Sequence, residues 1–442
     1  QKMFGGENMK KKLVSVLLCA TMVTGLLVGC GKSGDDDKKS GDGEKETITM
    51  WCPPLDDNLL ENWEPLLEDF KEENNCEIDI QVQPWENYEE KWSSGAASGE
   101  LPDIGYMYAE MFPTYIDSGA VADMTEYITD EDKEEYLYLD HGYMMDGQYG
   151  FPIVTGVPFV LYYNEDILNE LGEQPPQTWD DFKRICEKAT KDTDGDGKVD
   201  QYGYAVGFNN GSMNMLYLLN AYFYSLLWQS GTDIYNDDYK TVKFNNEAGQ
   251  EAAEFFLSLK DYMPENMMSL AAEDAFSTIF GQGKAAFGVT RSSAIQETLF
   301  KESYSNLNWN YVTSLKNKDY GTFGATDCLT LSSQAKNPKL CMKLIKYITG
   351  SEFMTEYHKI ASGAPLTKSE PYQGDAKMER IVTEDRDKYR PLQVGPCGSD
   401  ILQNLASELQ GMMEGNKTPK EALDDAAAYG DQALDEYWAD KE

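Results

Sequence analysis

Short runs of alternating or apolar residues recur along the chain between longer stretches with apolar residues at helical spacing. Residues 47–51 and 77–82 have the alternation of strands, and both runs are short. Between them, residues 59–73 place apolar side chains such as Leu66 and Phe70 four positions apart, which predicts a helix. Strands that alternate with helices in this way are typical of an α/β fold.

Three further helices are predicted from the residues at their beginnings. Residues 178–181 (Thr-Trp-Asp-Asp) have the form of a capping box, and the apolar residues that follow share one helical face. Residues 337–338 place an Asn cap before a Pro at the first helical position. Residues 418–421 (Thr-Pro-Lys-Glu) repeat the capping pattern near the end of the chain.

The first 46 residues have the features of a targeting signal and a linker rather than those of a folded domain. Residues 9–30 begin with three lysines, continue with an apolar run too short for a stable membrane span, and end in Leu-Val-Gly-Cys. This ending resembles the bacterial lipobox, so we expect a lipoprotein signal peptide over 9–30 and a diacylated Cys30 as the mature N-terminus. The alternative is a plain secretory signal with a chance Cys.

Residues 31–46 consist almost entirely of Gly, Ser, Asp, Glu and Lys, which have nothing to bury and predict a flexible tether. One diacylglyceryl group supplies two acyl chains, and two chains are enough for stable anchoring. We therefore expect the folded part to be held at the outer face of a membrane, in contact with the membrane through the anchor only.

Composition narrows the classes of function. The chain of 442 residues has 77 Asp and Glu against 38 Lys and Arg, a formal charge of -39, which disfavours nucleic acid as a partner. Its two histidines, His141 and His358, leave little material for a His-based zinc site or a His-dependent catalytic triad. The six cysteines after Cys30 are scattered without a CxxC pair, and the sequence does not say whether any of them form disulfides.

Several short motifs, in order, carry a resemblance to a known family. They are the Pro-Asp-Ile segment at 101–104, Tyr-Asn-Glu-Asp-Ile-Leu at 163–168, Pro-Pro-Gln-Thr-Trp at 175–179, Gly-Lys-Ala-Ala-Phe at 283–287, and Gly-Ala-Pro at 363–365. Together they resemble the family 1 extracellular solute-binding proteins of ABC importers, the group of maltodextrin-binding proteins. The resemblance covers nearly the whole chain from residue 47 onward.

This resemblance implies an α/β fold of the periplasmic-binding-protein type (type II), with two lobes and a ligand cleft between them. Lobe one is expected at 46–158 plus 314–364, and lobe two at 159–313 plus 365–442. Loops at strand ends that face such a cleft are where α/β proteins bind ligands. The crossings between lobes are expected near 159–162, near 311–313 and near Pro365.

A sugar presents hydroxyl edges and apolar faces, so its site needs aromatic plates together with polar donors and acceptors. Glu110 falls where the family has an acidic cleft residue, whereas Met107 stands in place of a Trp plate, which Tyr108 could replace. Thr290–Ser293 replaces the family's Gly-x-Trp and puts maltodextrin itself in doubt, although Arg291 would suit a more polar or acidic sugar. The candidate ligand-binding residues are Trp51, Glu86, Tyr106, Tyr108, Glu110, Asn210, Trp228, Arg291, Tyr320 and Asp327.

Trp85 and Tyr222 are additional candidates, and against each aromatic stands the simpler interpretation that it packs in the core. For Trp63, Trp179 and Phe223, which lie on apolar helical faces, we expect core packing. The same expectation holds for Tyr217. For Trp51 we favour the ligand, and for Trp228 the two interpretations are balanced.

A calcium site is predicted directly after the helix that begins near Thr178. Residues 192–200 supply oxygen ligands at loop positions one, three, five and nine, with a Gly at six and a backbone carbonyl at seven. The bidentate Glu expected at position twelve is absent, but Gln201 could reach back, as an acidic residue does in alginate-binding members that this loop resembles. The alternative is an ordinary Asp/Gly turn. The candidate Ca²⁺ ligands are Asp192, Asp194, Asp196, Lys198, Asp200 and Gln201.

We therefore expect a monomeric solute-binding lipoprotein that delivers a carbohydrate, an oligosaccharide by preference, to the permease subunits of an ABC transporter, without being an enzyme. The main alternative keeps the fold and changes the cargo to a polyamine or a peptide. A surface glycoside hydrolase is a further alternative, but no motif singles out a carboxylate pair. A sensor or adhesin on the same fold is not distinguished by the sequence.

Overall fold

The computed structural model describes residues 45–209, 216–292, 299–361 and 363–441, and residues 45–442 form one compact unit. Cys30, the predicted signal peptide and all but the last two residues of the predicted tether lie outside the described residues. Asn210 also lies outside them. These assignments therefore stay predictions.

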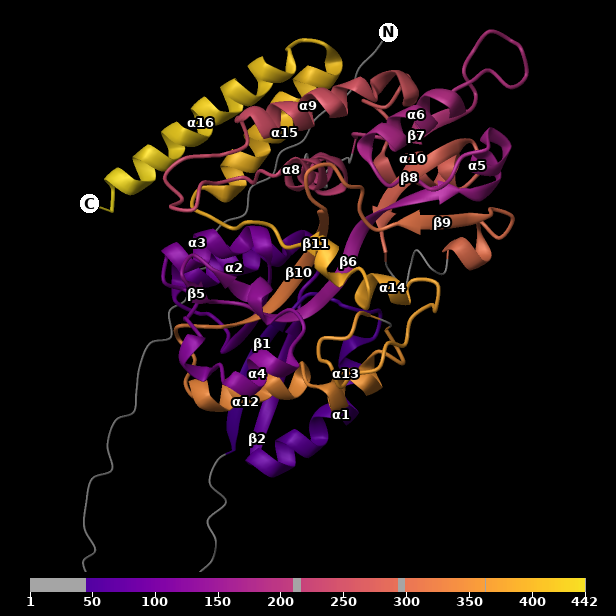
Figure 1. Ribbon diagram of the computed structural model, residues 1–442. Coiled ribbons are helices and arrows are strands. Elements are labelled where there is room, and N and C mark those ends of the chain that lie inside the picture. Colours follow the sequence, from indigo (N-terminus) through magenta and orange to yellow (C-terminus); the bar gives the residue numbers. More distant parts are fainter. Residues whose placement is uncertain (1–44, 210–215, 293–298, 362, 442) are drawn as a thin grey trace, which may run out of the picture. The chain divides into compact units, whose positions relative to one another are not determined.

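A mixed sheet organises the described residues, with its strands in the order β2-β1-β3-β10-β6-β8-β7 (Figure 1). β1 is parallel to both β2 and β3, whereas β10 is antiparallel to β3 and to β6. β9 pairs with β6, and β11 pairs with β10. The strands are β1 (Glu46–Cys52), β2 (Cys76–Val82), β3 (Ile104–Tyr108), β6 (Phe151–Asn164), β7 (Tyr202–Ala205), β8 (Ala285–Arg291), β9 (Trp309–Val312), β10 (Thr322–Leu331) and β11 (Tyr389–Arg390), with β4 (Tyr143–Met144) and β5 (Gly147–Gln148) in a second small sheet.

β6 is the strand that joins the two halves of the sheet. Its first residues, 151–158, pair with β10, and its last residues, 159–164, pair with β8 and β9. β10 in turn pairs with β3, so residues 322–331 lie next to the parallel strands formed by the beginning of the folded chain. Side chains on β3, β8 and β10 are brought near one another by this central pair of strands.

Helices cover the sheet, and their beginnings follow the capping chemistry of the sequence. The capping boxes predicted at Thr178 and Thr418 are both present, and Asn337 caps the helix that begins at Pro338, so these three predictions are confirmed. The helices are α1 (Leu59–Asn74), α2 (Tyr88–Ser98), α3 (Phe112–Asp117), α4 (Asp130–Glu135), α5 (Glu165–Leu171), α6 (Trp179–Ala189), α7 (Leu216–Leu218), α8 (Tyr224–Ser230), α9 (Glu247–Ser258), α10 (Ala272–Ala275), α12 (Pro338–Ile348), α13 (Ser351–Tyr357), α14 (Glu379–Val382), α15 (Gly398–Glu414) and α16 (Pro419–Ala439).

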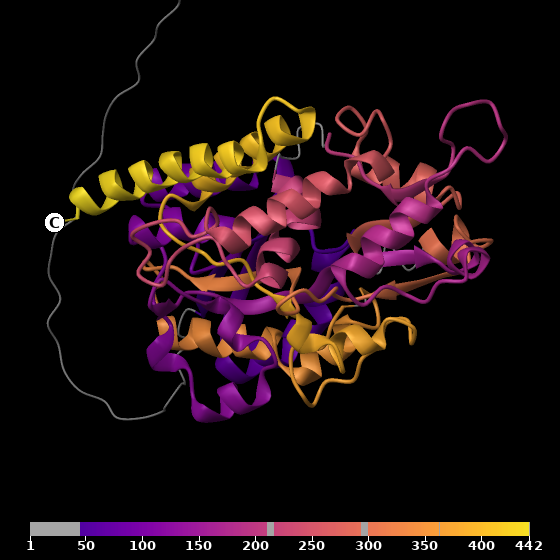
Figure 2. The ribbon, with the colours of Figure 1, turned by 45° about the horizontal axis from the view of Figure 1, so that its top comes forward.

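Single turns link several of these elements. The ones that bear on the site are η1 (Trp85–Asn87), η2 (Ala109–Met111) and the π-helical turn η5 (Leu219–Phe223), which leads directly into α8. The C-terminal helices α15 and α16 pack against each other and both contact α9 (Figures 1 and 2). α15 also contacts α7 and η2, so it lies close to the residue that follows β3.

The buried apolar side chains form two large clusters and a smaller one. One cluster draws mainly on residues 48–153 and 328–366, and the other mainly on 159–323 and 392–434. Trp63, Trp179 and Phe223 are buried in these clusters, which confirms their expected core packing. The domain boundaries given above are not defined by these clusters alone and stay a prediction.

The six cysteines among the described residues are free thiols, and Cys186 and Cys341 are buried on helices α6 and α12. Among the helices that the structure describes, none combines the length and the apolar character that crossing a membrane requires.

Candidate functional site

A tyrosine–carboxylate pair, with a buried Tyr106 and a partly buried Asp327, lies where β3 and β10 run side by side. The Tyr106 hydroxyl donates a hydrogen bond of 2.5 Å to Oδ2 of Asp327. Burial raises the pKa of the Asp327 carboxyl to about 6, although this hydrogen bond and the nearby positive charge of Arg291 act in the opposite direction. Tyr106 itself is almost fully buried, so its hydroxyl holds the carboxylate in a fixed position. The two residues were both predicted site residues, and the structure brings them together.

Glu110 stands on η2, two residues after the end of β3. Its side chain makes no hydrogen bond or ion pair with another side chain of the described residues. Burial raises the pKa of the Glu110 carboxyl to about 7. A hydrogen bond from its own backbone N–H acts against this rise, and the negative charges of Asp327 and Glu89 add to it. The structure therefore brings Glu110 within electrostatic reach of the Tyr106–Asp327 pair.

Trp85 offers an aromatic surface next to this pair. It lies on η1, its side chain is 45% exposed, and its ring meets the ring of Tyr106 edge to face with 5.9 Å between the centroids. An exposed Trp is unusual away from binding surfaces because its large apolar ring gains by burial. Trp85 is therefore the aromatic plate that best fits a sugar-binding role in this region.

Three further side chains surround the two carboxyl groups. Arg291, at the end of β8, is exposed and acts electrostatically on Asp327. The Tyr108 hydroxyl donates a hydrogen bond to Oε1 of Glu89, which lies on α2. Tyr224, on α8, is fully buried, and its hydroxyl has no hydrogen-bond partner among the described residues although it lies within electrostatic reach of Glu110.

We call these residues, contributed by several elements, the carboxylate site. It consists of Trp85, Glu89, Tyr106, Tyr108, Glu110, Tyr224, Arg291 and Asp327. Carboxylate oxygens accept hydrogen bonds from hydroxyl or ammonium groups, and aromatic rings pack against apolar faces of a ligand. The arrangement can therefore bind a small polar molecule that offers donors and one apolar face.

Two aromatic candidates lie in the core. For Trp51 the ligand was the favoured interpretation, which is therefore wrong, and for Trp228 the two interpretations were balanced. Trp51 is 5% exposed, and its ring packs edge to face on Trp92 and against the backbone of Gly95. Trp228 is 1% exposed, stacks on Tyr224, and donates from Nε1 to Asp233. Both are strand-end or helix residues whose large apolar rings are taken up by neighbouring elements, which single-residue patterns do not show.

Two other candidates lie apart from the carboxylate site as defined. Glu86 is exposed on η1 beside Trp85 and has no side-chain partner among the residues described. Tyr320 instead lines a polar pocket of 220 Å³ together with Arg380, Asp385 and Lys388. Because that pocket includes neither Tyr106 nor Asp327, Tyr320 and Asp327 do not share one cavity there. A second, apolar pocket lies inside the cluster around Phe182 and is a packing gap.

Two residues of the carboxylate site were missed by sequence reasoning. Tyr224 lies in the segment Ala-Tyr-Phe-Tyr-Ser-Leu-Leu-Trp at 221–228, whose dense aromatic pattern reads as core. Glu89 lies exposed on helix α2 next to one other acidic residue, Glu90, and has no local signature. Only the unsatisfied hydroxyl of Tyr224 and the hydrogen bond from Tyr108 mark them, and both are products of tertiary structure.

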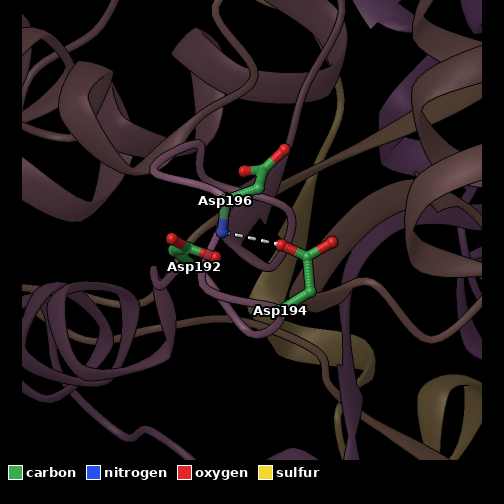
Figure 3. A group of neighbouring side chains, drawn as sticks. All are labelled: Asp192, Asp194 and Asp196. Carbon is green, nitrogen blue, oxygen red and sulfur yellow. Dashed lines mark hydrogen bonds between the residues drawn. The ribbon is translucent and has the colours of Figure 1, made fainter.

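The loop after α6 gathers three exposed carboxylates. One oxygen from each of Asp192, Asp194 and Asp196 can be chosen so that all lie within 4.8 Å of one another (Figure 3). Asp192 accepts hydrogen bonds from the backbone N–H groups of Gly195 (2.6 Å) and Gly197 (2.7 Å), which hold the pKa of its carboxyl below the usual value. Both glycines have positive φ values, as the tight turn requires.

The remaining predicted calcium ligands are arranged differently from the sequence expectation. The Asp200 carboxylate accepts hydrogen bonds from the backbone N–H and the hydroxyl of Thr193. The Gln201 side chain is buried and donates to the carbonyl of Ala189 at the end of α6, so in this arrangement it does not reach back into the loop. The Lys198 N–H donates to Asp196. The three gathered carboxylates suit a cation that prefers oxygen ligands, whereas the Gln201 side chain is hydrogen-bonded to the last turn of α6.

Comparison with known proteins places the chain in a family. Residues 66–381 match the family described as bacterial extracellular solute-binding protein. A binding protein of Brucella abortus is 24% identical over 83% of this chain and 88% of its own length. The galactooligosaccharide-binding protein of Bacillus subtilis is 23% identical over 95% of this chain and 96% of its own length.

Solved structures show the same fold. The sugar-binding protein MalE of Xanthomonas citri matches with a TM-score of 0.73 at 17% identity, over 90% of this chain and 99% of that chain. The expected two-lobe α/β fold of the type II periplasmic-binding proteins is thereby confirmed, and the position of a ligand cleft between the lobes stays a prediction. The resemblance found in the sequence is confirmed as well, and the chain belongs to the bacterial extracellular solute-binding proteins.

Proposed function

We propose that this protein binds a carbohydrate, an oligosaccharide by preference, at the carboxylate site and passes it to the permease subunits of an ABC transporter. The observation that carries this proposal is the exposed Trp85 ring set beside the Tyr106–Asp327 pair, which joins an aromatic plate to fixed hydrogen-bond acceptors. Similar proteins support it, since a relative is a galactooligosaccharide-binding protein and a structural neighbour is a sugar-binding protein.

We further propose that the protein is a binding protein without catalytic activity, anchored by lipid at Cys30 and acting as a monomer. The family description supports an extracellular binding role. A relative from Bacillus subtilis that is 27% identical over 46% of this chain carries the name lipoprotein, which supports the anchor. Mass spectrometry of the chain produced in a bacterium should show a diacylglyceryl group on Cys30, and its absence in the mature protein would contradict the anchor.

A structural calcium ion at Asp192, Asp194 and Asp196 is part of the same proposal. The gathered oxygens and the turn glycines support it, and oxygen ligands of this kind suit Ca²⁺. The ion would neutralise three carboxylates at the end of α6 and would stabilise the folded state by mass action. None of the three aspartates belongs to the carboxylate site, so the expected role of the ion is structural.

The test of carbohydrate binding is a thermal-shift panel on the full chain with malto-, xylo-, manno-, galacto- and chito-oligosaccharides. A ligand at a hundred times its dissociation constant adds about 2.7 kcal/mol to the free energy of unfolding, which raises the melting temperature by a few degrees. The Trp85→Ala variant should lose the shift. Tyr143→Ala, at another exposed aromatic residue, is the matched control. A panel in which no sugar shifts the transition contradicts carbohydrate as the cargo.

A further inference from the structure

The charges around Glu110 do not balance. Each charged group that affects its carboxyl is itself negative, namely Asp327 on β10 and Glu89 on α2. Asp327 has one positive neighbour, Arg291, which is exposed and forms no ion pair with it within 4.0 Å. Three carboxyl groups thus face one guanidinium group, and Glu110 is influenced by none of that positive charge.

A second, independent feature marks the same place as a ligand site. The Tyr224 side chain is fully buried, its hydroxyl is unpartnered among the described residues, and it lies within electrostatic reach of Glu110. Buried hydroxyl groups are hydrogen-bonded in the great majority of proteins because an unmade hydrogen bond in the interior costs about 1–3 kcal/mol. An unsatisfied buried hydroxyl within electrostatic reach of a carboxyl that has no side-chain partner among the described residues is explained by a polar group that arrives with the ligand.

The energetics favour a positively charged ligand group. A carboxylate that loses water without gaining a cation is costly, which is why the pKa of Glu110 is raised. A neutral sugar would cover both carboxyl groups and leave their repulsion in place. An ammonium group has three N–H donors and no acceptor, and Glu110, Asp327 and Tyr224 offer acceptor oxygens from three different elements.

We propose that the ligand of this protein carries a protonated amino group, which pairs with Glu110 and Asp327 while Trp85 packs against the apolar face of the same molecule. The proposal rests on the proposed function and narrows it to sugars with free amino groups. A linear polyamine shares the ammonium chemistry without the sugar ring. Sugar acids and phosphorylated sugars are disfavoured, because Arg291 alone does not offset three carboxyl groups.

The test compares ligands that differ only in charge. Isothermal titration of the full chain at pH 7.5 uses the disaccharide of glucosamine, which has free amino groups, and N,N′-diacetylchitobiose, which has the same skeleton with the amino groups acetylated. Spermidine and a glucuronate disaccharide complete the set. We expect the glucosamine disaccharide to bind at least about ten-fold more tightly than its acetylated form, because close charge pairs contribute that much when desolvated.

Variants assign the preference to the site. Glu110→Gln and Asp327→Asn should each remove most of the ten-fold preference while circular dichroism shows an unchanged fold. Glu352→Gln, at an exposed glutamate on α13, is the matched control and should keep the preference. A preference that survives in both site variants overturns the assignment to these carboxyl groups.

The outcomes separate this inference from the proposed function. Equal or tighter binding of the acetylated or the anionic disaccharide overturns the amino-group inference and leaves carbohydrate binding in place. Binding of spermidine with no binding of any disaccharide supports the ammonium chemistry and overturns carbohydrate as the cargo. Absence of binding by both cationic probes overturns the inference.

Discussion

The loop at residues 192–200 and the carboxylate site both gather acidic side chains, yet their carboxyl groups are shifted in opposite directions. In the loop, Asp192 is exposed and accepts two backbone N–H groups, which lower the pKa of its carboxyl. In the carboxylate site, burial raises the pKa of Glu110 to about 7, against the lowering effect of a hydrogen bond from its own backbone N–H.

This difference explains what each place is suited to bind. Carboxylates that are exposed and already ionised are ready for a divalent cation, which binds oxygen ligands through its charge. Carboxyl groups that are partly buried and have raised pKa values gain most from a ligand that brings hydrogen-bond donors or positive charge. Under the proposals made above, the same residue types would hold a structural ion in one region and a transported molecule in the other.

The largest effect is expected at the carboxylate site. In the Asp327→Asn variant, the affinity for the sugar that gives the largest thermal shift should fall about 10- to 100-fold, because a hydrogen bond to a charged group contributes about 1.5–3 kcal/mol. Isothermal titration measures it, with Asp69→Asn on the exposed face of α1 as the control. An unchanged dissociation constant in Asp327→Asn would place the ligand elsewhere.

The loop should respond to calcium and not to sugar. Adding Ca²⁺ at a hundred times its dissociation constant should raise the free energy of unfolding by about 2.7 kcal/mol, and excess chelator should reverse the change in melting temperature. Asp194→Ala should abolish this response and leave sugar affinity unchanged. Differential scanning calorimetry follows the first effect and titration the second. A melting temperature that changes neither with calcium nor with chelator would contradict the calcium proposal.

The two regions also differ in how well the sequence predicts them. The loop is made by consecutive residues, so Asp192, Asp194 and Asp196 were identified together from spacing alone. Even there, the role of Gln201 was misjudged, because its partner is the carbonyl of Ala189 at a helix end twelve residues earlier. The position of a side chain can be predicted from the neighbouring sequence only when its hydrogen-bond partners are also close in sequence.

The carboxylate site is assembled from residues far apart in the chain. Glu110 was found because it falls where the family has an acidic cleft residue, and Tyr106 because it lies in the segment that follows the family's Pro-Asp-Ile motif; Asp327 was a further candidate, and the pairing of β3 with β10 that joins it to Tyr106 was not foreseen. Trp51 was expected at the ligand but packs in the core, and Tyr224 was not a candidate, since whether a ring packs in the core or borders a site depends on neighbours such as Trp92 that no spacing reveals. The fold class and the helix caps were predictable, but side-chain surroundings were not.

A pH series sharpens the contrast between the two kinds of carboxyl. The pKa of Glu110 is raised from 4.5 to about 7 on folding, so its ionisation destabilises the fold progressively between these values and fully above pH 7. Glu110→Gln removes this cost. The variant should therefore match the parent protein near pH 4.5 and exceed its free energy of unfolding by about 1–2 kcal/mol at pH 8, the full shift being reduced by solvent screening.

Urea titrations at the two pH values measure this difference, and Glu352→Gln, whose carboxyl is exposed, is the control. Asp327 and Glu89 raise the pKa of Glu110, so their repulsion with its carboxylate is part of the pH-dependent cost that Glu110→Gln removes. Glu352→Gln leaves Asp327, Glu89 and Arg291 in their original surroundings. A stability gain in Glu110→Gln that is equal at both pH values would mean that the substitution acts through packing and not through the charge.

The smallest effect is expected at Tyr224. Removing its hydroxyl in Tyr224→Phe deletes a buried group without a described partner, so the free protein should keep its stability or gain up to about 1 kcal/mol. If the hydroxyl meets the ligand, affinity should fall about three- to ten-fold. Tyr235→Phe, at a buried tyrosine whose hydroxyl donates to the carbonyl of Pro396, is the control and should lose stability without losing affinity. Equal losses of stability in the two variants would show that Tyr224 is an ordinary core residue, and Tyr224 would then not belong to the carboxylate site.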